Sequence, residues 1–94
     1  MPAYWIAHVI VTNEDAYSRY ASGATAAIEH HGGQFLARGG RHLQLEGVDH
    51  PRNVVALFPS MEAAETCYRS PEYQAALTHA RGAAVRDLVI VESL

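Results

Sequence analysis

Two kinds of hydrophobic pattern alternate along the chain, and their order predicts the secondary structure. Continuous runs of aromatic, β-branched and small residues predict three strands, at residues 4–11, 53–58 and 86–92. Residues 34–38 predict a shorter strand that breaks at Gly39 and Gly40. Residues 41–46 are a candidate continuation of that strand beyond a bulge or turn. Four strands are therefore expected, and the extent of the second is left open.

Between these runs, apolar residues recur every three or four positions, which predicts two helical regions. The first begins after a cap at Thr12 or Asn13 and ends at the glycine pair 32–33. The second begins after Ser60 and is kinked at residues 70–71, where a serine cap and a first-position proline restart the helix. Two helical pieces with a kink between them are expected in this second region.

The predicted order is β-α-β-β-α-β, the ferredoxin-like arrangement of an α+β fold, in which helices cover one face of an antiparallel sheet. The long strands are apolar at odd and even positions alike, whereas a sheet with one solvated face alternates apolar and polar residues. Both faces should therefore be dry. The chain's own helices cover one face, and we predict that a second copy covers the other in a homodimer.

Composition narrows the classes of function. A chain of 94 residues is a single domain, 1–94, and its 49% hydrophobic content argues against disorder. A net charge of −3 without a basic run argues against nucleic-acid binding. The apolar run 4–11 is too short to span a membrane, and the lone Cys67 fits a reducing compartment. We expect a cytoplasmic protein that binds neither membranes nor nucleic acid.

Six histidines raise the question of a metal site. His30 and His31 are adjacent, so on a helix their side chains diverge by about 100°. No His-x-x-x-His pair or histidine–carboxylate motif occurs, and motifs for nucleotide phosphates or serine hydrolysis are also missing. We therefore expect neither a metal nor another cofactor.

Several motifs stand in an order that is similar to a known family. They are residues 4–9, 32–40, 70–74 and 87–92, and on them the chain resembles the domain of unknown function 1330 family over nearly its whole length. One departure is Cys67, a position at which family members often carry an aromatic residue.

The resemblance implies a dimeric α/β barrel, in which two sheets pack face to face with the helices outside. Related families in this superfamily include cofactor-independent monooxygenases, muconolactone isomerases, haem-degrading proteins and stress-response proteins. Such a range means that the fold alone does not select a chemistry.

Three residues are the candidate catalytic groups. His8 lies in the middle of an apolar strand, where it is either a satisfied core histidine or an acid–base group. Arg38 ends a strand beside two glycines, which suits an anionic ligand; the alternative is a bulge with Arg38 paired to Glu46 or Asp87. Tyr73 begins the last helix, where its hydroxyl would orient a ligand or its ring would simply pack.

We predict that His8, Arg38 and Tyr73 line one pocket between sheet and helices, within about 10 Å of one another. Glu46, Tyr68 and Arg81 are further candidates for ligand binding, although helix packing or the helix dipole also accounts for Tyr68 and Arg81.

The leading hypothesis is a protein that binds a small anionic or aromatic metabolite, with a cofactor-independent monooxygenase or isomerase as its catalytic form. The alternative is a non-catalytic dimeric structural or stress-related module, whose polar residues only satisfy the barrel interior. The sequence does not decide whether the protein is an enzyme.

Overall fold

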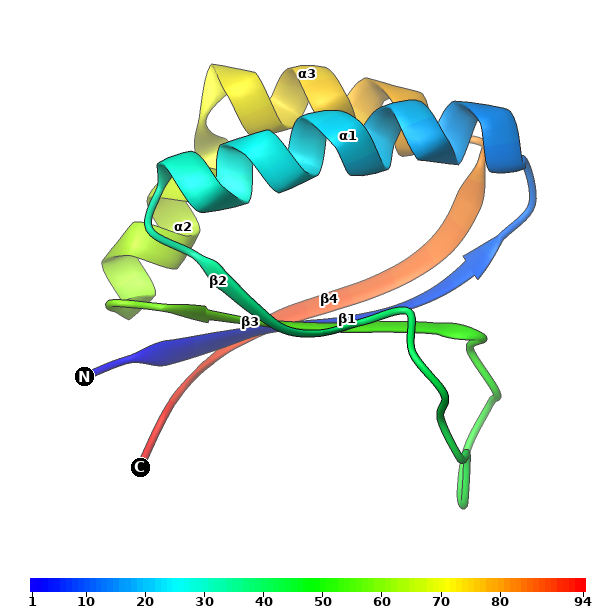
Figure 1. Ribbon diagram of the computed structural model, residues 1–94, viewed down its shortest axis with the longest axis horizontal. Coiled ribbons are helices and arrows are strands. Elements are labelled where there is room, and N and C mark those ends of the chain that lie inside the picture. The colour runs from blue at the N-terminus through cyan, green and yellow to red at the C-terminus, as the bar shows by residue number, and fades with distance from the viewer.

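The computed structural model describes residues 1–94 and has the predicted order of elements (Figure 1). The elements are β1 (Ala3–Val11), α1 (Glu14–His30), β2 (Gln34–Arg38), β3 (Arg52–Phe58), α2 (Met61–Arg69), α3 (Pro71–Ala80) and β4 (Ala84–Glu92). The candidate continuation of β2 at residues 41–46 is not a strand, because the whole segment 39–51 is a loop. This loop contains two glycines with positive φ, Gly39 and Gly47.

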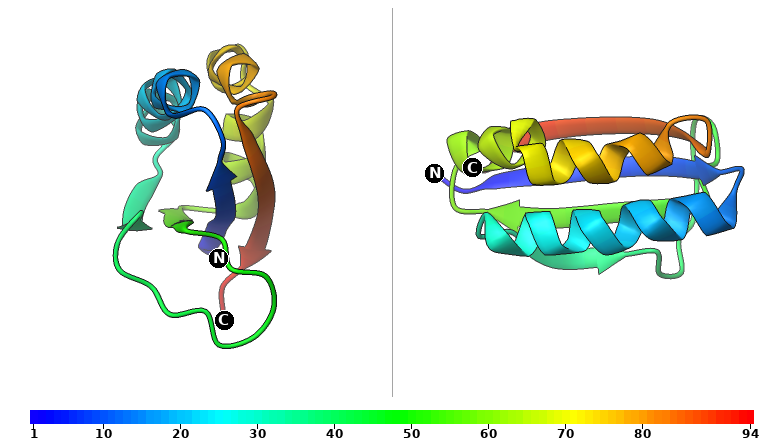
Figure 2. Two further views of the ribbon diagram at one scale, coloured as in Figure 1. Left: turned by 90° about the vertical axis from the view of Figure 1, so that its right-hand side faces the viewer. Right: turned by 90° about the horizontal axis from the view of Figure 1, so that it is seen from above.

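The four strands form one antiparallel sheet in the order β2-β3-β1-β4, which confirms the ferredoxin-like α+β fold. Figure 2 shows α1 and α3 side by side over one face of this sheet. A bulge interrupts β2 between Phe35 and Ala37, earlier than the expected break at Gly39. Because one extra residue in a strand reverses the facing of those that follow, this bulge turns Arg38 toward α1.

Side-chain caps fix where the helices begin. Asn13 accepts a hydrogen bond from the backbone N–H of Ala16 at the start of α1. Ser70 ends α2 and caps α3, where its hydroxyl accepts from the N–H of Tyr73 and Pro71 occupies the first turn. The predicted kink is thus confirmed, and it places the Tyr73 ring on the face of α3 that meets the sheet.

The core lies between the sheet and the helices. Trp5, Ala7 and Val9 of β1 are buried beneath them, as are the aromatic rings of Phe58 and Tyr73. Helices α1 and α3 approach closely at Gly23, where a Cβ would lie 2.8 Å from that of Ala76. Cys67 of α2 is also fully buried.

The other side of the sheet, here called the open face, is the surface away from the helices. Its aliphatic side chains on β4 are about half exposed, with exposed fractions of 57% for Val85, 54% for Val89 and 46% for Val91. The loop 39–51 projects on this same side of the sheet and exposes Leu43 and Leu45 (Figure 1). None of the three helices combines the length and apolar character needed to cross a membrane.

Candidate functional site

A pair of tyrosine hydroxyls marks the polar centre of the helix-covered core. Tyr20 of α1 and Tyr73 of α3 are almost fully buried, and their oxygens are 2.7 Å apart. Arg86, which enters from β4, donates through Nη2 to the Tyr20 oxygen at 2.7 Å and to the Tyr73 oxygen at 3.4 Å. Its guanidinium carbon also lies 4.5 Å from the centre of the Tyr20 ring. Three elements distant in sequence therefore meet at one hydrogen-bonded group.

Burial sets the protonation of this group. Desolvation disfavours the phenolate, so the pKa of Tyr20 and that of Tyr73 are both raised above the ordinary phenol value. The neighbouring phenol of Tyr73 raises the pKa of Tyr20 further, because two adjacent phenolates would repel each other. Both tyrosines are thus neutral hydrogen-bonding groups at physiological pH, and Arg86 supplies the positive charge.

Two further arginines approach the same region. Arg52 of β3 has its guanidinium carbon 5.7 Å from the centre of the Tyr17 ring. Arg38 of β2 donates to the hydroxyl of Thr25 at 3.3 Å and lies 4.4 Å from the centre of the Phe35 ring. Gly39 gives Arg52 room, since a Cβ there would stand 2.8 Å from its Nη1.

None of these three arginines has an acidic partner, since the four ion pairs of the structure involve other residues. The Nε atoms of Arg52 and Arg86 are buried and make no hydrogen bond. Because buried polar atoms are normally hydrogen-bonded, two unpaired Nε atoms among three arginines without acidic partners need an explanation.

A small cavity lies between α1 and the sheet, with all three arginines in its wall. Its volume is about 30 Å³, and an apolar wall surrounds the arginines and Tyr20, formed by Trp5, Ala7, Ala21, Ala24, Ile28, Phe35 and Val54, together with Thr25. Arg38 and Arg52 also border an adjoining surface groove of about 350 Å³. Since these two side chains stand between the two spaces, their movement would join cavity and groove.

The lining of the cavity contains no carboxylate and no imidazole. With Tyr20 neutral and three arginines in its wall, the cavity offers hydrogen-bond donors and positive charge, and no side chain suited to accept a proton near neutral pH. The arrangement can hold an anion. It cannot remove a proton through a conventional base of its own.

His8 lies on the open face, away from this cavity. The side chains of residues 5, 7 and 9 point to the helices, so strand alternation turns position 8 the other way. There the Nδ1 atom of His8 is 2.6 Å from Oδ1 of Asn53, and Asp87 occupies the facing position on β4. The prediction that His8, Arg38 and Tyr73 line one pocket is therefore wrong.

Of the other candidates, only Tyr68 is near the cluster. Its ring packs against Tyr73 with the ring centres 5.3 Å apart, and it does not line the cavity. Glu46 is exposed in the loop 39–51, and Arg81 is exposed at the end of α3. The alternative pairing of Arg38 with Glu46 or Asp87 is also not formed, because Arg38 instead contacts Thr25.

Sequence reasoning missed Tyr20, Arg52 and Arg86. Tyr20 belongs to the apolar stripe of α1, and such a stripe by itself indicates only packing. Arg52 and Arg86 each pair with Val9 in the sheet register, one on either side, so all three side chains share the helix-covered face. Their pairing with the buried Val9 is what would have identified Arg52 and Arg86 as facing the core. The residue pattern does not specify this strand pairing.

Comparisons with solved structures agree on the fold. A protein of unknown function from Rhodopseudomonas palustris superposes with a TM-score of 0.78 at 25% identity, covering 99% of this chain and 82% of that one. SnoaB, a cofactor-independent oxygenase from Streptomyces nogalater, has a TM-score of 0.70 at 12% identity, with 99% and 93% covered. A dimeric ferredoxin-like protein of unknown function from Jannaschia sp. CCS1 has a TM-score of 0.70 at 14% identity, with 99% and 100% covered.

These likenesses establish a shared architecture and leave the activity of this chain open, since most of these proteins have no known function. No functionally curated protein has significant sequence similarity to it. A family model does match, and it spans residues 2–94, so the chain belongs to the DUF1330 family, a domain of unknown function.

Proposed function

We propose that this protein binds a small anionic metabolite with a planar apolar body where the cavity between α1 and the sheet adjoins the surface groove, the two spaces joining when Arg38 and Arg52 move aside. The observation that carries the proposal is the unpaired positive charge: Arg38, Arg52 and Arg86 line one cavity without an acidic partner, and two of them hold a buried, unpaired Nε. An anion would supply the missing acceptors. The charge on the ligand would thus replace the carboxylate that a structural arginine normally has.

The register of the sheet favours a ligand that bridges two arginines. Arg52 and Arg86 flank Val9 in adjacent strands, so their backbones are roughly 10 Å apart, twice the spacing of neighbouring strands. A carboxylate, enolate or phenolate oxygen between them would relieve the repulsion of two like charges. The aromatic and aliphatic wall contributed by Trp5 and Phe35 suits a flat apolar body beside that oxygen.

If the protein catalyses a reaction on this ligand, we propose that it is a cofactor-independent oxygenase. The fold that it shares with SnoaB supports this activity. In that case Arg86 and the two phenols would stabilise negative charge on a ligand oxygen. Because the cavity lining carries no base, the substrate would be one that ionises readily by itself, such as an acidic enol or phenol.

A non-catalytic module is the second candidate, and the position of His8 favours it. With His8 on the open face, the imidazole considered as an acid–base group is separated from the arginines. Binding without turnover is consistent with this separation.

The protein is also proposed to be a homodimer that pairs through the open face. Ile6 and Ile10 of β1 face Val89 and Val85 of β4, which makes this surface aliphatic where a monomer would be solvated. The dimeric ferredoxin-like protein from Jannaschia sp. CCS1 shares the architecture and supports such an assembly.

Isothermal titration with benzoate and 2-hydroxybenzoate, compared with neutral benzyl alcohol, tests the binding proposal. We expect the anions to bind, the alcohol not to bind, and Arg52→Met to weaken anion binding at least tenfold. The matched control is Arg69→Met, because Arg69 pairs with Glu65 on the exposed side of α2 and should leave binding unchanged. Equal binding of the alcohol, or equal loss in both variants, would contradict the proposal.

A further inference from the structure

A second polar cluster lies where the end of α1 meets the start of α3, and it shares no residue with the lining of the arginine cavity. His31 is the C-cap of α1 and its ring centre is 5.2 Å from that of His30, so the divergence expected on a helix does not separate them. His30, His31 and Glu72 each offer one potential ligand atom, and these three atoms lie within 4.8 Å of one another. His30 Nδ1 is 3.3 Å from Glu72 Oε2. The kink at Ser70 and Pro71 produces this meeting, because it restarts the helix beside the last turn of α1.

The hydrogen bond of His31 fixes which nitrogen is free. Its Nδ1 is 2.8 Å from the carbonyl oxygen of Ala27, and a carbonyl only accepts, so Nδ1 carries the proton. In the neutral ring Nε2 then holds an unshared electron pair. Metal-binding histidines are characteristically oriented in this way, with the second nitrogen donating to a backbone carbonyl.

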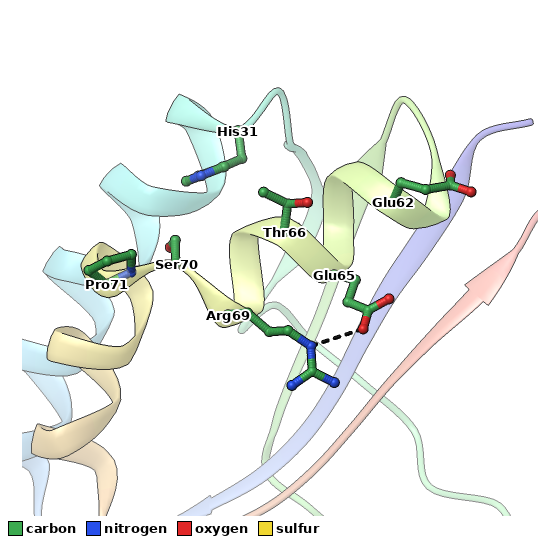
Figure 3. A pocket seen from close by; sticks show the side chains of 7 residues that line it. All are labelled: His31, Glu62, Glu65, Thr66, Arg69, Ser70 and Pro71. Carbon is green, nitrogen blue, oxygen red and sulfur yellow. Dashed lines mark hydrogen bonds and ion pairs between the residues drawn. The ribbon is translucent and has the colours of Figure 1, made fainter.

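The surroundings also suit a cation. The last carbonyl groups of α1 carry the negative end of that helix's dipole, and His30 and His31 stand at this end. His31 lines a groove of about 600 Å³ together with Glu62, Glu65, Thr66 and Arg69 (Figure 3). In that figure the Arg69 guanidinium contacts Glu65, so its positive charge is engaged away from the histidines.

We propose that His30, His31 and Glu72 form a binding site for one divalent transition-metal ion of the zinc class, with water from the groove completing the coordination. Two imidazoles and a carboxylate are a ligand set that zinc accepts. Ligand atoms that each lie about 2.1 Å from a tetrahedral ion are roughly 3.4 Å from one another. In the structure the three ligand atoms are separated by up to 4.8 Å. The side chains of His30 and Glu72 are 73% and 41% exposed, so they are free to close that difference by rotation.

The bound ion would tie α1 to α3 at one end of the helix pair. Sequence motifs do not reveal such a site, because Glu72 belongs to another helix than the histidines and a motif search compares only neighbouring positions. Metal binding to the folded protein alone would raise its apparent stability, in proportion to the logarithm of the free metal concentration.

Zinc chloride titrated into the metal-free protein, followed by calorimetry and by thermal unfolding, tests this site. We expect one ion per chain, a rise in melting temperature, and its reversal by a chelator. His31→Ala and Glu72→Gln should each weaken binding by more than about a hundredfold, because loss of an outer-shell partner alone costs about 10- to 100-fold. Circular dichroism of both variants without metal should match that of the original protein.

Two histidine controls locate the ion. His79→Ala removes an exposed histidine from the last turn of α3, and His42→Ala removes the histidine beside Asp49 in the loop 39–51. Both should bind zinc as the original protein does. Unchanged affinity in His31→Ala and Glu72→Gln, or loss of the ion in His42→Ala, would overturn the assignment.

Discussion

Two consecutive rows of side chains across the sheet differ in whether their polar groups have partners. The row Arg52–Val9–Arg86 points to the helices and places two cations without acids in the wall of a cavity. The next row, Asn53–His8–Asp87, points to the open face, and each of its three side chains has a partner.

The polar side chains of the Asn53–His8–Asp87 row are paired by two contacts. His8 contacts Asn53, and Asp87 lies 3.3 Å from Nε2 of His50 in the loop before β3. Paired polar groups among aliphatic side chains are suited to burial against a second protein surface, whereas unpaired arginines are suited to receiving a charged ligand. This difference supports the proposal that the open face mediates assembly and the helix-covered face binds the ligand.

The largest effect is expected from a charge on the open face. Val89→Asp places a carboxylate where the dimer would bury it without a partner, at a cost of several kcal/mol. We expect sedimentation equilibrium to show a monomer at micromolar concentration, while the original protein is a dimer. Thr78→Asp, on an exposed position of α3, is the matched control and should remain dimeric. A native protein that sediments as a monomer would refute the assembly proposal directly.

A smaller effect is expected from Arg86→Met, which removes charge and keeps much of the side-chain volume. Loss of a buried charged hydrogen-bond donor to a ligand costs about 2 kcal/mol or more, which is roughly a thirtyfold loss of affinity for benzoate. Stability should change less, because removing an uncompensated buried charge offsets the lost hydrogen bonds to the two tyrosines. Calorimetry and urea unfolding measure the two quantities separately. A lower free energy of unfolding without any change in benzoate affinity would show that Arg86 has only a structural role.

The tyrosine pair should make the fold sensitive to alkali. Because burial raises the pKa of Tyr20 and of Tyr73 in the folded state, their contribution to stability is complete below the unfolded phenol pKa of about 10. It is lost as the pH rises above that value. Tyr73→Phe should cost about 1 kcal/mol at pH 7 and reduce the alkaline loss, since one ionising group has been removed. Urea unfolding at pH 7 and above pH 10 provides the measurement, and an unchanged slope with pH would argue against this origin.

The smallest effect is expected at Cys67. Burial raises the pKa of its thiol to about 11, so the thiolate needed for alkylation is scarce at neutral pH. A thiol reagent should label the native protein slowly and the urea-unfolded protein fast. Cys67→Ala should cost about 1 kcal/mol of stability and leave ligand affinity unchanged. Fast labelling of the native protein would show that the thiol is accessible.

Local patterns predicted the elements of the fold well because caps, glycines and apolar runs act over a few residues. Asn13, Ser60 and Ser70 each cap a helix as expected, and the kink at Pro71 is present. The loop at residues 41–46 was harder to predict, because its leucines resemble a strand. In the structure Leu43 and Leu45 are exposed, so no packing holds that segment in a sheet.

The site was predicted less well because it depends on facing and register. Position 8 is flanked on both sides by apolar residues, so the pattern of β1 did not show which side His8 takes. The bulge between Phe35 and Ala37 determines which side of the sheet Arg38 faces, and no glycine in β2 marks the position of that bulge in the sequence. Arg86 joins Tyr20 and Tyr73 only after three elements have packed, which no local pattern contains.

The most direct test of the central claim is an NMR titration of the arginine Nε–Hε signals with benzoate. The signals of Arg52 and Arg86 report on the two buried Nε atoms that lack acceptors. The account predicts that both shift together and saturate with the ligand, while the signal of Arg69 stays in place because Glu65 already accepts from it. If benzoate left the Arg52 and Arg86 signals unmoved, or moved that of Arg69 as much, the cavity would not be the binding site.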